Sequence, residues 1–191
     1  MIKHKMYYDN QREWKIINSF VSTEGAIQAP FSFYYINNKD WSSSHNWDYW
    51  NINFTSAASI NNTLVIKTIY DPAVSGFAEP KTTAFTGFTY TGGNTSNSSL
   101  YNVKGNFTKG WNFYTQAWKT GDLIFFEAYG FRYTSGKNNG RISFLGEISY
   151  CWTAGTESVD RGINYASSSG LLNPQDNDFR SSGITCRPVL E

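Results

Sequence analysis

The sequence predicts a β-rich domain with few helices, and three observations support this class. Aromatic residues make up 18% of the 191 residues and charged residues only 16%, a balance that excludes a disordered chain. Helical periodicity is scarce. Short β-branched and aromatic runs are separated by Gly, Asn and Ser, which is typical of many short strands joined by turns. A chain of this length buries roughly 70% of its unfolded surface, enough for one core.

One short helix and several strands can be assigned to particular residues. Residues 11–20 form the best helix candidate, because Trp14, Ile17 and Phe20 fall on one side. Residues 31–35 alternate as a half-buried strand does, and residues 63–70 (TLVIKTIY) predict a strand that ends at Pro72. Further strands are predicted at residues 123–126 (LIFF, buried), 148–153, 162–166 and 184–189.

Two shifts in composition mark regions that differ from the rest. Residues 92–101 (GGNTSNSSLY) are polar and of low complexity, so we expect an exposed loop within one domain rather than a linker. After Gly130, as far as Ser182, the chain mixes Asn, Ser, Asp, Gly and Tyr with sparse apolar residues. No repeat of 20 to 50 residues is found, which excludes solenoids and propellers.

Charge and hydropathy exclude several classes of function. With 16 Lys and Arg against 15 Asp and Glu, the net charge of +1 argues against nucleic-acid binding and against charge-driven attachment to membranes. No run approaches the ~18 apolar residues of a membrane-spanning helix. The basic start, Met1 to Met6, is not followed by an apolar run, so it does not predict a secretory signal.

Residues with metal or nucleophile chemistry do not form a recognisable site. His4 and His45 are far apart in the sequence, and neither has a partner at ligand spacing. Cys151 and Cys186 are expected to be unpaired, although a disulfide between them remains open. Residues 176–178 (DND) resemble part of a calcium loop but lack its Gly and distal Glu, so a solvated turn is expected. Thus no catalytic residue, metal or cofactor is predicted.

Aromatic residues near position 45 have two interpretations. Trp41, Trp47 and Trp50 lie in the segment WSSSHNWDYW, and an aromatic face suits the apolar side of a sugar ring. Packing in the core, or around a loop, is the favoured interpretation for such a dense group. Trp111, Phe113 and Trp118 are likewise expected to be packing residues.

A series of short strings occurs in an order typical of one protein family. The strings are KTIYDP (67–72), GF (76–77), AFTGFT (84–89), GWNFY (110–114), IFF (124–126), Ala128, GFR (130–132), Tyr150 with Trp152, NP (173–174), Arg180, Gly183 and RPV (187–189). Together they resemble the Fibrobacter succinogenes major paralogous domain. Such domains are found in surface proteins of Bacteroidales, at the tips of fimbrillin-type pili, and in related phage receptor-binding proteins.

The resemblance covers residues 26–191 and implies a C-type-lectin-like fold: an α+β domain with few short helices and long loops. Residues 1–25 would then be an arm or leader outside the domain. Similar domains are diversified by retroelements that mutate adenines, and the composition of residues 133–182 fits a variable face of that kind. The chain departs from the family at Ala73 and Val74, where a cysteine-containing string is usual, and it lacks the calcium-binding strings of animal lectins. Cys151 and Cys186 fall where the family tends to carry Tyr or Ser, and Val, respectively, so the resemblance implies that both cysteines are incidental.

The residue types of this carboxyl-terminal stretch also favour binding. Tyr, Trp, Ser, Asn and Gly supply contact area and hydrogen bonds at low entropic cost, as they do in antibody loops. Aromatic members would anchor a ligand and polar members would tune specificity. The candidate ligand-binding residues are Tyr133, Glu147, Ser149, Trp152, Thr156, Glu157, Asp160, Tyr165, Asp176, Asp178 and Phe179. For Trp152 a place in the core is an equally good interpretation.

The sequence thus predicts a non-enzymatic recognition module of the adhesin type, displayed on a pilus tip or cell surface. Its partner would be a host or bacterial surface protein or glycan, together with other pilus or tail subunits, and neither nucleic acid nor direct membrane insertion is expected. A phage tail receptor-binding protein, carried on the virion, is the first alternative. An enzyme of the formylglycine-generating type is the second, because it shares the fold; it requires Cys151 and Cys186 to lie together in a pocket.

Overall fold

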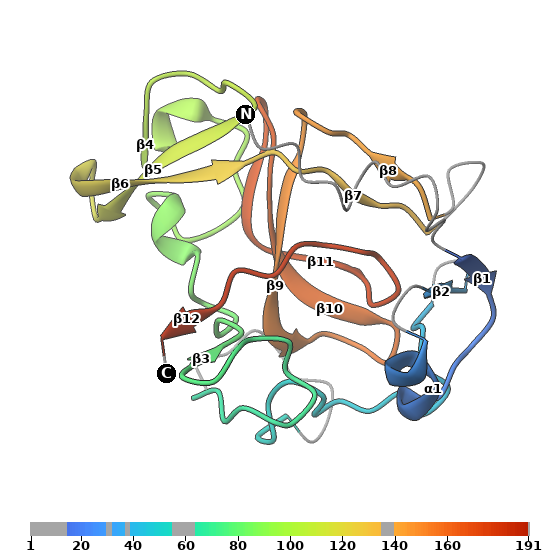
Figure 1. The fold of residues 1–191 in the computed structure, drawn as a ribbon. Coiled ribbons are helices and arrows are strands. Elements are labelled where there is room, and N and C mark those ends of the chain that lie inside the picture. The colour runs from blue at the N-terminus through green and yellow to red at the C-terminus, as the bar shows by residue number, and fades with distance from the viewer. Residues whose placement is uncertain (1–14, 30–31, 37–38, 55–63, 135–139, 191) are drawn as a thin grey trace.

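Strands dominate the structure and helices are few, which confirms the β-rich class (Figure 1). The computed structural model describes residues 15–29, 32–36, 39–54, 64–134 and 140–190. Within these ranges α1 (Thr23–Gln28) is the only α-helix, and Ser22 caps it by accepting a hydrogen bond from the Gly25 amide. Two 3-10 turns lie at Thr86–Phe88 and Ser98–Leu100. None of the described helices is long and apolar enough to cross a membrane.

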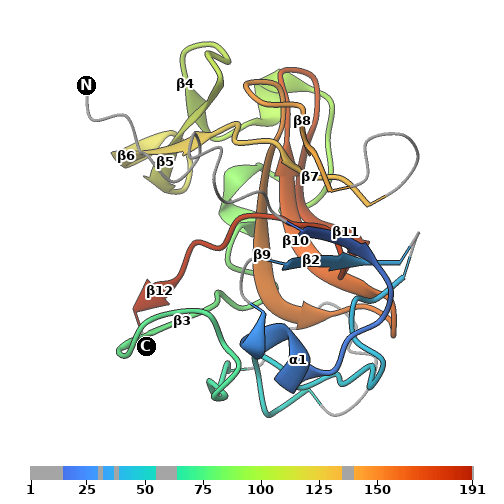
Figure 2. The ribbon, with the colours of Figure 1, turned by 45° about the vertical axis from the view of Figure 1, so that its right-hand side comes forward.

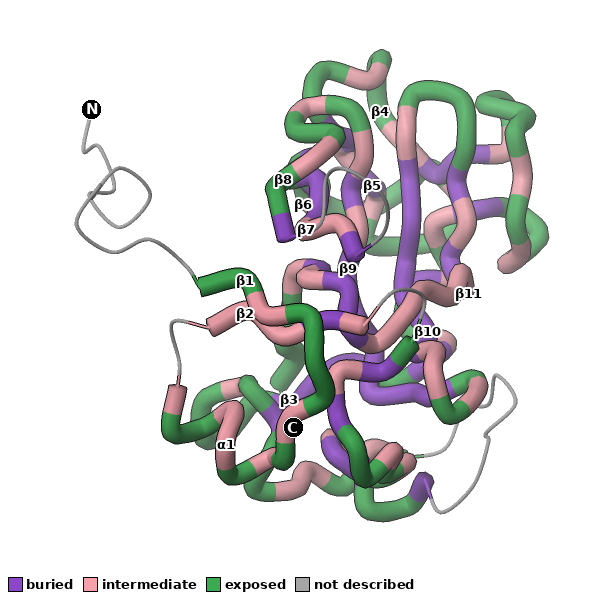
Figure 3. Tube along the Cα trace, turned by 90° about the vertical axis from the view of Figure 1, so that its right-hand side faces the viewer, coloured by how far each residue is buried: buried purple, intermediate pink, exposed green. Residues whose placement is uncertain are grey.

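A three-stranded antiparallel sheet forms the centre of the molecule. Its strands are β9 (Ser149–Thr156), β10 (Arg161–Ser167) and β11 (Leu172–Phe179), in the order β11-β10-β9. On its other side β9 bridges to Thr185, whose carbonyl accepts from the Trp152 amide at 2.9 Å. Because β9 and β10 have neighbours on both sides, they are buried over nearly their whole length (Figure 3). Small residues such as Ala, Gly, Ser and Thr let the chain pack closely there.

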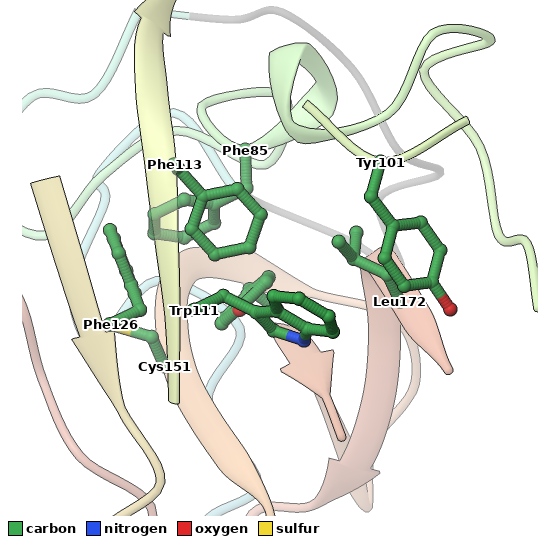
Figure 4. Close-up of a cluster of buried hydrophobic side chains, with 8 residues drawn as sticks. Phe85, Tyr101, Trp111, Phe113, Phe126, Cys151 and Leu172 are labelled. Carbon is green, nitrogen blue, oxygen red and sulfur yellow. The ribbon is translucent and has the colours of Figure 1, made fainter. Parts of the chain in front are cut away.

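A second antiparallel sheet covers one end of the central sheet, and the main core lies between them. It consists of β4 (Val103–Lys104), β5 (Gly110–Gln116) and β6 (Thr120–Glu127). Side chains from both sheets converge on a largely aromatic cluster (Figure 4). The rings of Phe88 and Phe113 stack at 3.8 Å, and the Trp111 indole N–H donates to the Ser168 carbonyl at 2.9 Å. The buried members are Phe85, Tyr101, Trp111, Phe113, Phe126, Cys151, Tyr165 and Leu172.

Three two-stranded pairs complete the described fold. β1 (Lys15–Asn18) runs parallel to β2 (Ser32–Tyr35), and this pair lies with α1 beside the central sheet (Figures 1 and 2). β3 (Phe77–Ala78) pairs with β12 (Val189–Leu190). The third pair joins β7 (Phe131–Arg132) to β8 (Ile142–Ser143).

Several predicted elements are confirmed with shifted bounds. The strands at residues 32–35, 149–156 and 161–167 are present, and residues 92–100 form an exposed or half-buried loop that includes the 3-10 turn at Ser98–Leu100. The last residue of the predicted exposed loop, Tyr101, is instead fully buried in the main core. The predicted strand at 123–126 is part of β6, but it is not buried on both faces, since Leu123 and Phe125 are exposed. Trp111 and Phe113 are core residues, and both cysteines are unpaired, as expected.

Other predicted elements are wrong. The predicted helix at 11–20 fails at residues 15–18, which form β1; residues 11–14 lie outside the described ranges. No strand occurs within residues 64–70; among the described residues, their main chain is bonded only to the segment that follows Trp50 and within its own turn. The strand predicted at 184–189 is reduced to β12 and one bridge at Thr185. In these cases tertiary contacts outweighed local propensity.

β11 was missed because its sequence, LNPQDNDF, is polar and contains proline. It is the edge strand of the central sheet, where proline is tolerated because one side of the strand needs no ladder bonds. The register with β10 also shifts between Asn164 and Ala166, opposite Pro174. The missing proline N–H therefore falls at an irregularity rather than in the ladder. Residues 176–178 consequently lie in a strand and not in the solvated turn that was expected.

A buried carboxyl group lies just after β3. Glu79 has 0% exposure, and no N–H or O–H group of the described residues donates to its carboxyl oxygens. Burial raises the pKa of Glu79 from its ordinary 4.5 to about 7; Asp71 raises it further, whereas Lys67 and the Cys186 thiol lower it. The folded protein therefore holds a proton that the unfolded chain releases between these two pH values.

We predict that Glu79→Gln weakens the pH dependence of stability. In the native protein the free energy of unfolding should fall as pH rises from about 4.5 to about 7, because the folded state comes to carry an unpaired buried charge. A shift of this size corresponds to a loss of roughly 3 kcal/mol in the free energy of unfolding over this pH range. The glutamine variant, which has no proton to release, should not show this loss. Urea unfolding at pH 5 and pH 8 measures the difference. Identical pH dependence in the two proteins would contradict this assignment.

Candidate functional site

The segment from Trp41 to Trp50 and the central sheet enclose an aromatic pocket. The cavity itself has a volume of about 60 Å³, and with the adjoining space that is open to solvent the total is about 440 Å³. Strands β9 and β10 supply one wall, and the tryptophan-rich segment supplies the other. The lining residues are Trp41, Trp47, Tyr49, Trp50, Trp152, Thr153, Ala154, Gly155, Thr156, Gly162 and Arg180. Hereafter we call this site the aromatic pocket.

Four of the five aromatic rings of the pocket are in contact with another ring of the pocket. Trp41 and Tyr49 stack at 5.7 Å with an angle of 23°, and Trp50 meets Trp152 edge to face at 6.4 Å. The Tyr49 hydroxyl shares hydrogen bonds with Ser42 and Ser44, each at 2.7 Å. Edge-to-face and offset stacked pairs each add roughly 0.5–1.5 kcal/mol beyond burial. Half-buried tryptophans held in this way present a rigid surface rather than a mobile one.

A buried ion pair ties the tryptophan-rich segment to the end of β11. Asp40 is fully buried, and its Oδ2 lies 3.3 Å from Nη1 of Arg180. The Arg180 guanidinium also donates to the Asn46 carbonyl at 2.7 Å and lies 5.3 Å from the centre of the Tyr49 ring. Asp160 completes the link, because its Oδ1 accepts from the Asp40 amide at 3.0 Å. Three parts of the chain, namely residues 40–49, Asp160 and Arg180, thus meet behind the aromatic pocket.

Burial sets the protonation behaviour of this ion pair. Desolvation raises the pKa of Asp40, and the charges of Arg180 and His45 act in the opposite direction; neither carboxyl oxygen of Asp40 accepts a hydrogen bond from the described residues. Nδ1 of His45 lies 3.5 Å from Asp40 Oδ2. Asp40 is fully buried and the Arg180 side chain is 10% exposed, so removing Arg180 would leave the Asp40 charge in the interior without its ion-pair partner.

Glycine is required where β10 passes beneath the pocket. A Cβ atom added at Gly162 would lie 2.9 Å from the Trp152 ring, closer than real Cβ contacts. The bare backbone of Gly162 therefore allows this ring to lie flat against β10. Thr156 adds a further tie, since its hydroxyl donates to the Trp47 carbonyl at 3.3 Å.

Of the ligand-binding residues predicted from sequence, the structure brings two into the aromatic pocket. Trp152 and Thr156 line it directly. Both are mostly buried, at 5% and 7% exposure, so Trp152 is a core residue that also forms a pocket wall. Asp160 lies behind the pocket through its bond to Asp40.

Two other predicted residues are buried away from any surface. Tyr165 has 0% exposure within the main aromatic cluster, and its hydroxyl is bonded to Ser167. Ser149 is also buried, at 3% exposure. The prediction that these residues stand on an exposed face is wrong, because β9 and β10 form the centre of the molecule. The idea of one continuous display face from residue 133 to residue 182 fails for the same reason; residues 135–139 lie outside the described ranges.

Four predicted residues gather on the outer part of β10 and β11. The Arg161 guanidinium lies 4.1 Å from the centre of the Phe179 ring and donates to Asn177 at 2.6 Å. Asn177 in turn donates to the Glu157 carboxylate at 3.1 Å. Asp176 and Asp178 are half-buried beside them, and burial raises the pKa of each. The polar groups of this cluster are thus mainly hydrogen-bonded to one another.

The last two predicted residues lie elsewhere. Tyr133 is half-buried against Phe131, with its ring centre 5.4 Å away, and belongs to a second, smaller apolar cluster. Glu147 is exposed and precedes β9. Within the described residues, no group of three or more His, Cys, Asp and Glu side chains is arranged to hold a metal ion.

The tryptophan-rich segment serves both packing and the pocket. Trp41, Trp47 and Trp50 are half-buried and line the pocket, and Trp50 also packs against the smaller apolar cluster, as the packing prediction expected. The close spacing of the three tryptophans in the sequence was the feature that could have indicated a pocket here. Tyr49 and Arg180 carried no comparable signal, because the contact between positions so far apart in the sequence depends on the fold.

We predict that Arg180→Ala destabilises the protein by roughly 3 kcal/mol or more, since Asp40 is then left buried and charged. The double variant Asp40→Asn with Arg180→Leu, which removes both charges, should lose less. Urea unfolding at pH 7 checks both values. An Arg180→Ala variant as stable as the native protein would show that the pair does not hold the pocket together.

Comparison of this chain with family models, with curated proteins and with solved structures finds no match. The site is therefore interpreted from its own geometry.

Proposed function

We propose that this chain is a non-enzymatic recognition module that binds a sugar ring in the aromatic pocket. The observation that carries the proposal is the pocket itself: four tryptophans and a tyrosine, contributed by one short segment and by β9, surround a single open cavity. Pockets of this kind, apolar with a few polar groups, are the usual form of small-ligand sites.

The chemistry of the lining suits a saccharide. The C–H face of a pyranose packs against an indole ring, and its hydroxyl oxygens accept hydrogen bonds. Among the described residues no acceptor receives the indole N–H of Trp41, Trp47, Trp50 or Trp152, whereas that of Trp111 is bonded to Ser168. The pocket thus offers both apolar faces and free donors. Because Trp41, Tyr49, Trp50 and Trp152 are held by ring contacts, these four side chains lose little conformational entropy when a ligand binds.

The wider assignment follows from the resemblance described above and is part of the same proposal. It holds that the fold is C-type-lectin-like and that the module acts as an adhesin on a pilus tip or cell surface, or as a receptor-binding protein on a phage tail. A compact antiparallel central sheet, few helices and long loops support it. The partner would then be a glycan on a host or bacterial surface.

The enzyme alternative depends on reactive cysteines, and the thiols here are poorly suited to that role. Burial raises the pKa of Cys151 to about 12; Cys186 is exposed at the surface, and desolvation around its sulfur and the nearby Glu79 raise the pKa of that thiol. Because the thiolate is the nucleophile and the metal ligand, both thiols are held in the less reactive form. This observation favours binding over cysteine-based catalysis.

A glycan array followed by calorimetry tests the proposal. We expect the native protein to bind a subset of immobilised bacterial or mucosal glycans. Trp47→Ala and Trp50→Ala should each weaken binding to these at least fivefold, or about 1 kcal/mol, because each removes one stacking face.

The matched control is Trp118→Ala. This tryptophan is also half-buried and meets Tyr90 edge to face at 5.1 Å, but it lies outside the pocket. Its loss should leave glycan affinity unchanged. Failure to bind any glycan of the array, or undiminished binding by the Trp47→Ala and Trp50→Ala double variant, would contradict the proposal.

A further inference from the structure

A second surface feature lies apart from the aromatic pocket. It is a wide groove with about 2130 Å³ of empty space, including its open side, and it shares no lining residue with the pocket. Residues 64–69 form one wall, and the β3–β12 pair contributes to another. Its apolar side chains are unusually exposed: Leu64 at 73%, Ile69 at 90% and Leu190 at 76%. Exposed apolar surface of this kind marks an interaction site in a soluble domain.

The main chain of residues 64–67 is bonded in the alternating manner of an edge strand. Ile66 donates its amide to Asn51 Oδ1 at 3.0 Å and accepts from the Ile52 amide at 3.1 Å. Leu64 accepts from Asn53 Nδ2 at 2.8 Å. By contrast, the main-chain N–H and C=O groups of Val65 and Lys67 have no hydrogen-bond partner among the described residues. The main chain of Leu64 and Ile66 is thus hydrogen-bonded within the protein, whereas the main-chain groups of Val65 and Lys67 are available to a partner.

Side-chain contacts hold this segment in place. The Lys67 ammonium donates to the carbonyls of Val74 at 2.9 Å and Phe77 at 2.7 Å, and also to that of Ala73. It also lies 3.9 Å from Asp71. The open main-chain groups are therefore attached to a fixed segment, which reduces the entropic cost of pairing with another strand.

We propose that a second copy of this chain pairs with residues 64–68, antiparallel, across a two-fold axis. In an antiparallel pair, hydrogen-bonded positions alternate with non-bonded positions. If Ile66 lies opposite the partner's Ile66, then Val65 faces the partner's Lys67, and Lys67 faces the partner's Val65. The open N–H and C=O groups of these two residues then form four hydrogen bonds, with none left over. An interface of this kind uses the same patch on both subunits.

Charge in the groove is compatible with such self-pairing. The Lys67 ammonium lies 3.9 Å from the Asp71 carboxylate, and the Glu79 carboxyl group is buried at 0% exposure. The exposed Lys81 is the remaining charged side chain of the lining, and it lies outside residues 64–68. At the axis the two isoleucines would approach closely as a non-bonded pair, which is where cross-strand apolar contact is greatest. The strand-like sequence of residues 63–70, which finds no strand partner within residues 64–70, is accounted for by this arrangement.

The test measures the mass of the full chain by analytical ultracentrifugation over a wide range of concentration. We expect a reversible dimer. Ile66→Lys should raise its dissociation constant at least tenfold, because two ammonium groups would meet at the axis. Ile69→Lys is the matched control: Ile69 is more exposed, but it lies beyond the four hydrogen bonds, so the dimer should persist.

A second pair of variants tests the main chain directly. Val65→Pro removes the amide that would donate across the axis, whereas Val65→Thr keeps it with a β-branched side chain. Only the proline variant should dissociate the dimer, and urea unfolding verifies that each variant remains folded. Amide exchange at Val65 and Lys67 should slow as concentration rises.

A native chain that stays monomeric at every concentration overturns the proposal. So does a dimer that Ile66→Lys and Val65→Pro leave intact, since another surface must then hold it. Trp47→Ala should leave the dimer unchanged, so this result is independent of glycan binding.

Discussion

The buried ion pair between Asp40 and Arg180 is the constraint on which the aromatic pocket depends. It joins a segment near the start of the described chain to the residue that follows β11. Without it, three tryptophans and Tyr49 would lie on a loop held mainly by ring contacts. With it, and with the bonds from Asp160 and to Asn46, the loop is fixed against the central sheet. A charged pair is an expensive means of attachment, because both groups lose their hydration, yet its geometry is specific.

Strands β9 and β10 of the central sheet supply the other wall of the pocket. Both strands are buried over nearly their whole length. The small residues of the central sheet bring β9 and β10 close together, and Gly162 leaves room for the Trp152 ring. The same close packing explains why polar residues such as Ser149 and Thr153 lie inside. The Thr153 hydroxyl donates to the Ile163 carbonyl at 2.8 Å, so its burial costs little. From composition, these polar residues were expected on an exposed surface that accepts substitutions. They are buried instead, because hydrogen bonds within the sheet satisfy their polar groups.

The sequence predicted the β-rich class and the long strands of the centre, because β-branched and aromatic runs between turn residues are a strong local signal. It did not predict β11, because proline is rare within strands. β11 accommodates Pro174 because it is an edge strand and because its register with β10 shifts opposite this residue. Nor did the sequence predict that Tyr165 is enclosed by Phe85, Phe113 and Phe126, since tyrosine is common both in binding faces and in cores. Only contacts between distant residues, such as Tyr49 with Arg180, decide which aromatic side chains remain accessible.

The most direct test of the central claim follows the indole N–H signals of ¹⁵N-labelled tryptophan by NMR while pooled glycans are added. If the aromatic pocket binds a sugar ring, the signals of Trp47, Trp50 and Trp152 should shift, because their N–H groups are free to donate. The signals of Trp111, which is bonded to Ser168, and of Trp118 should stay in place. Shifts confined to Trp118, or no shift at any pocket indole, would contradict the account.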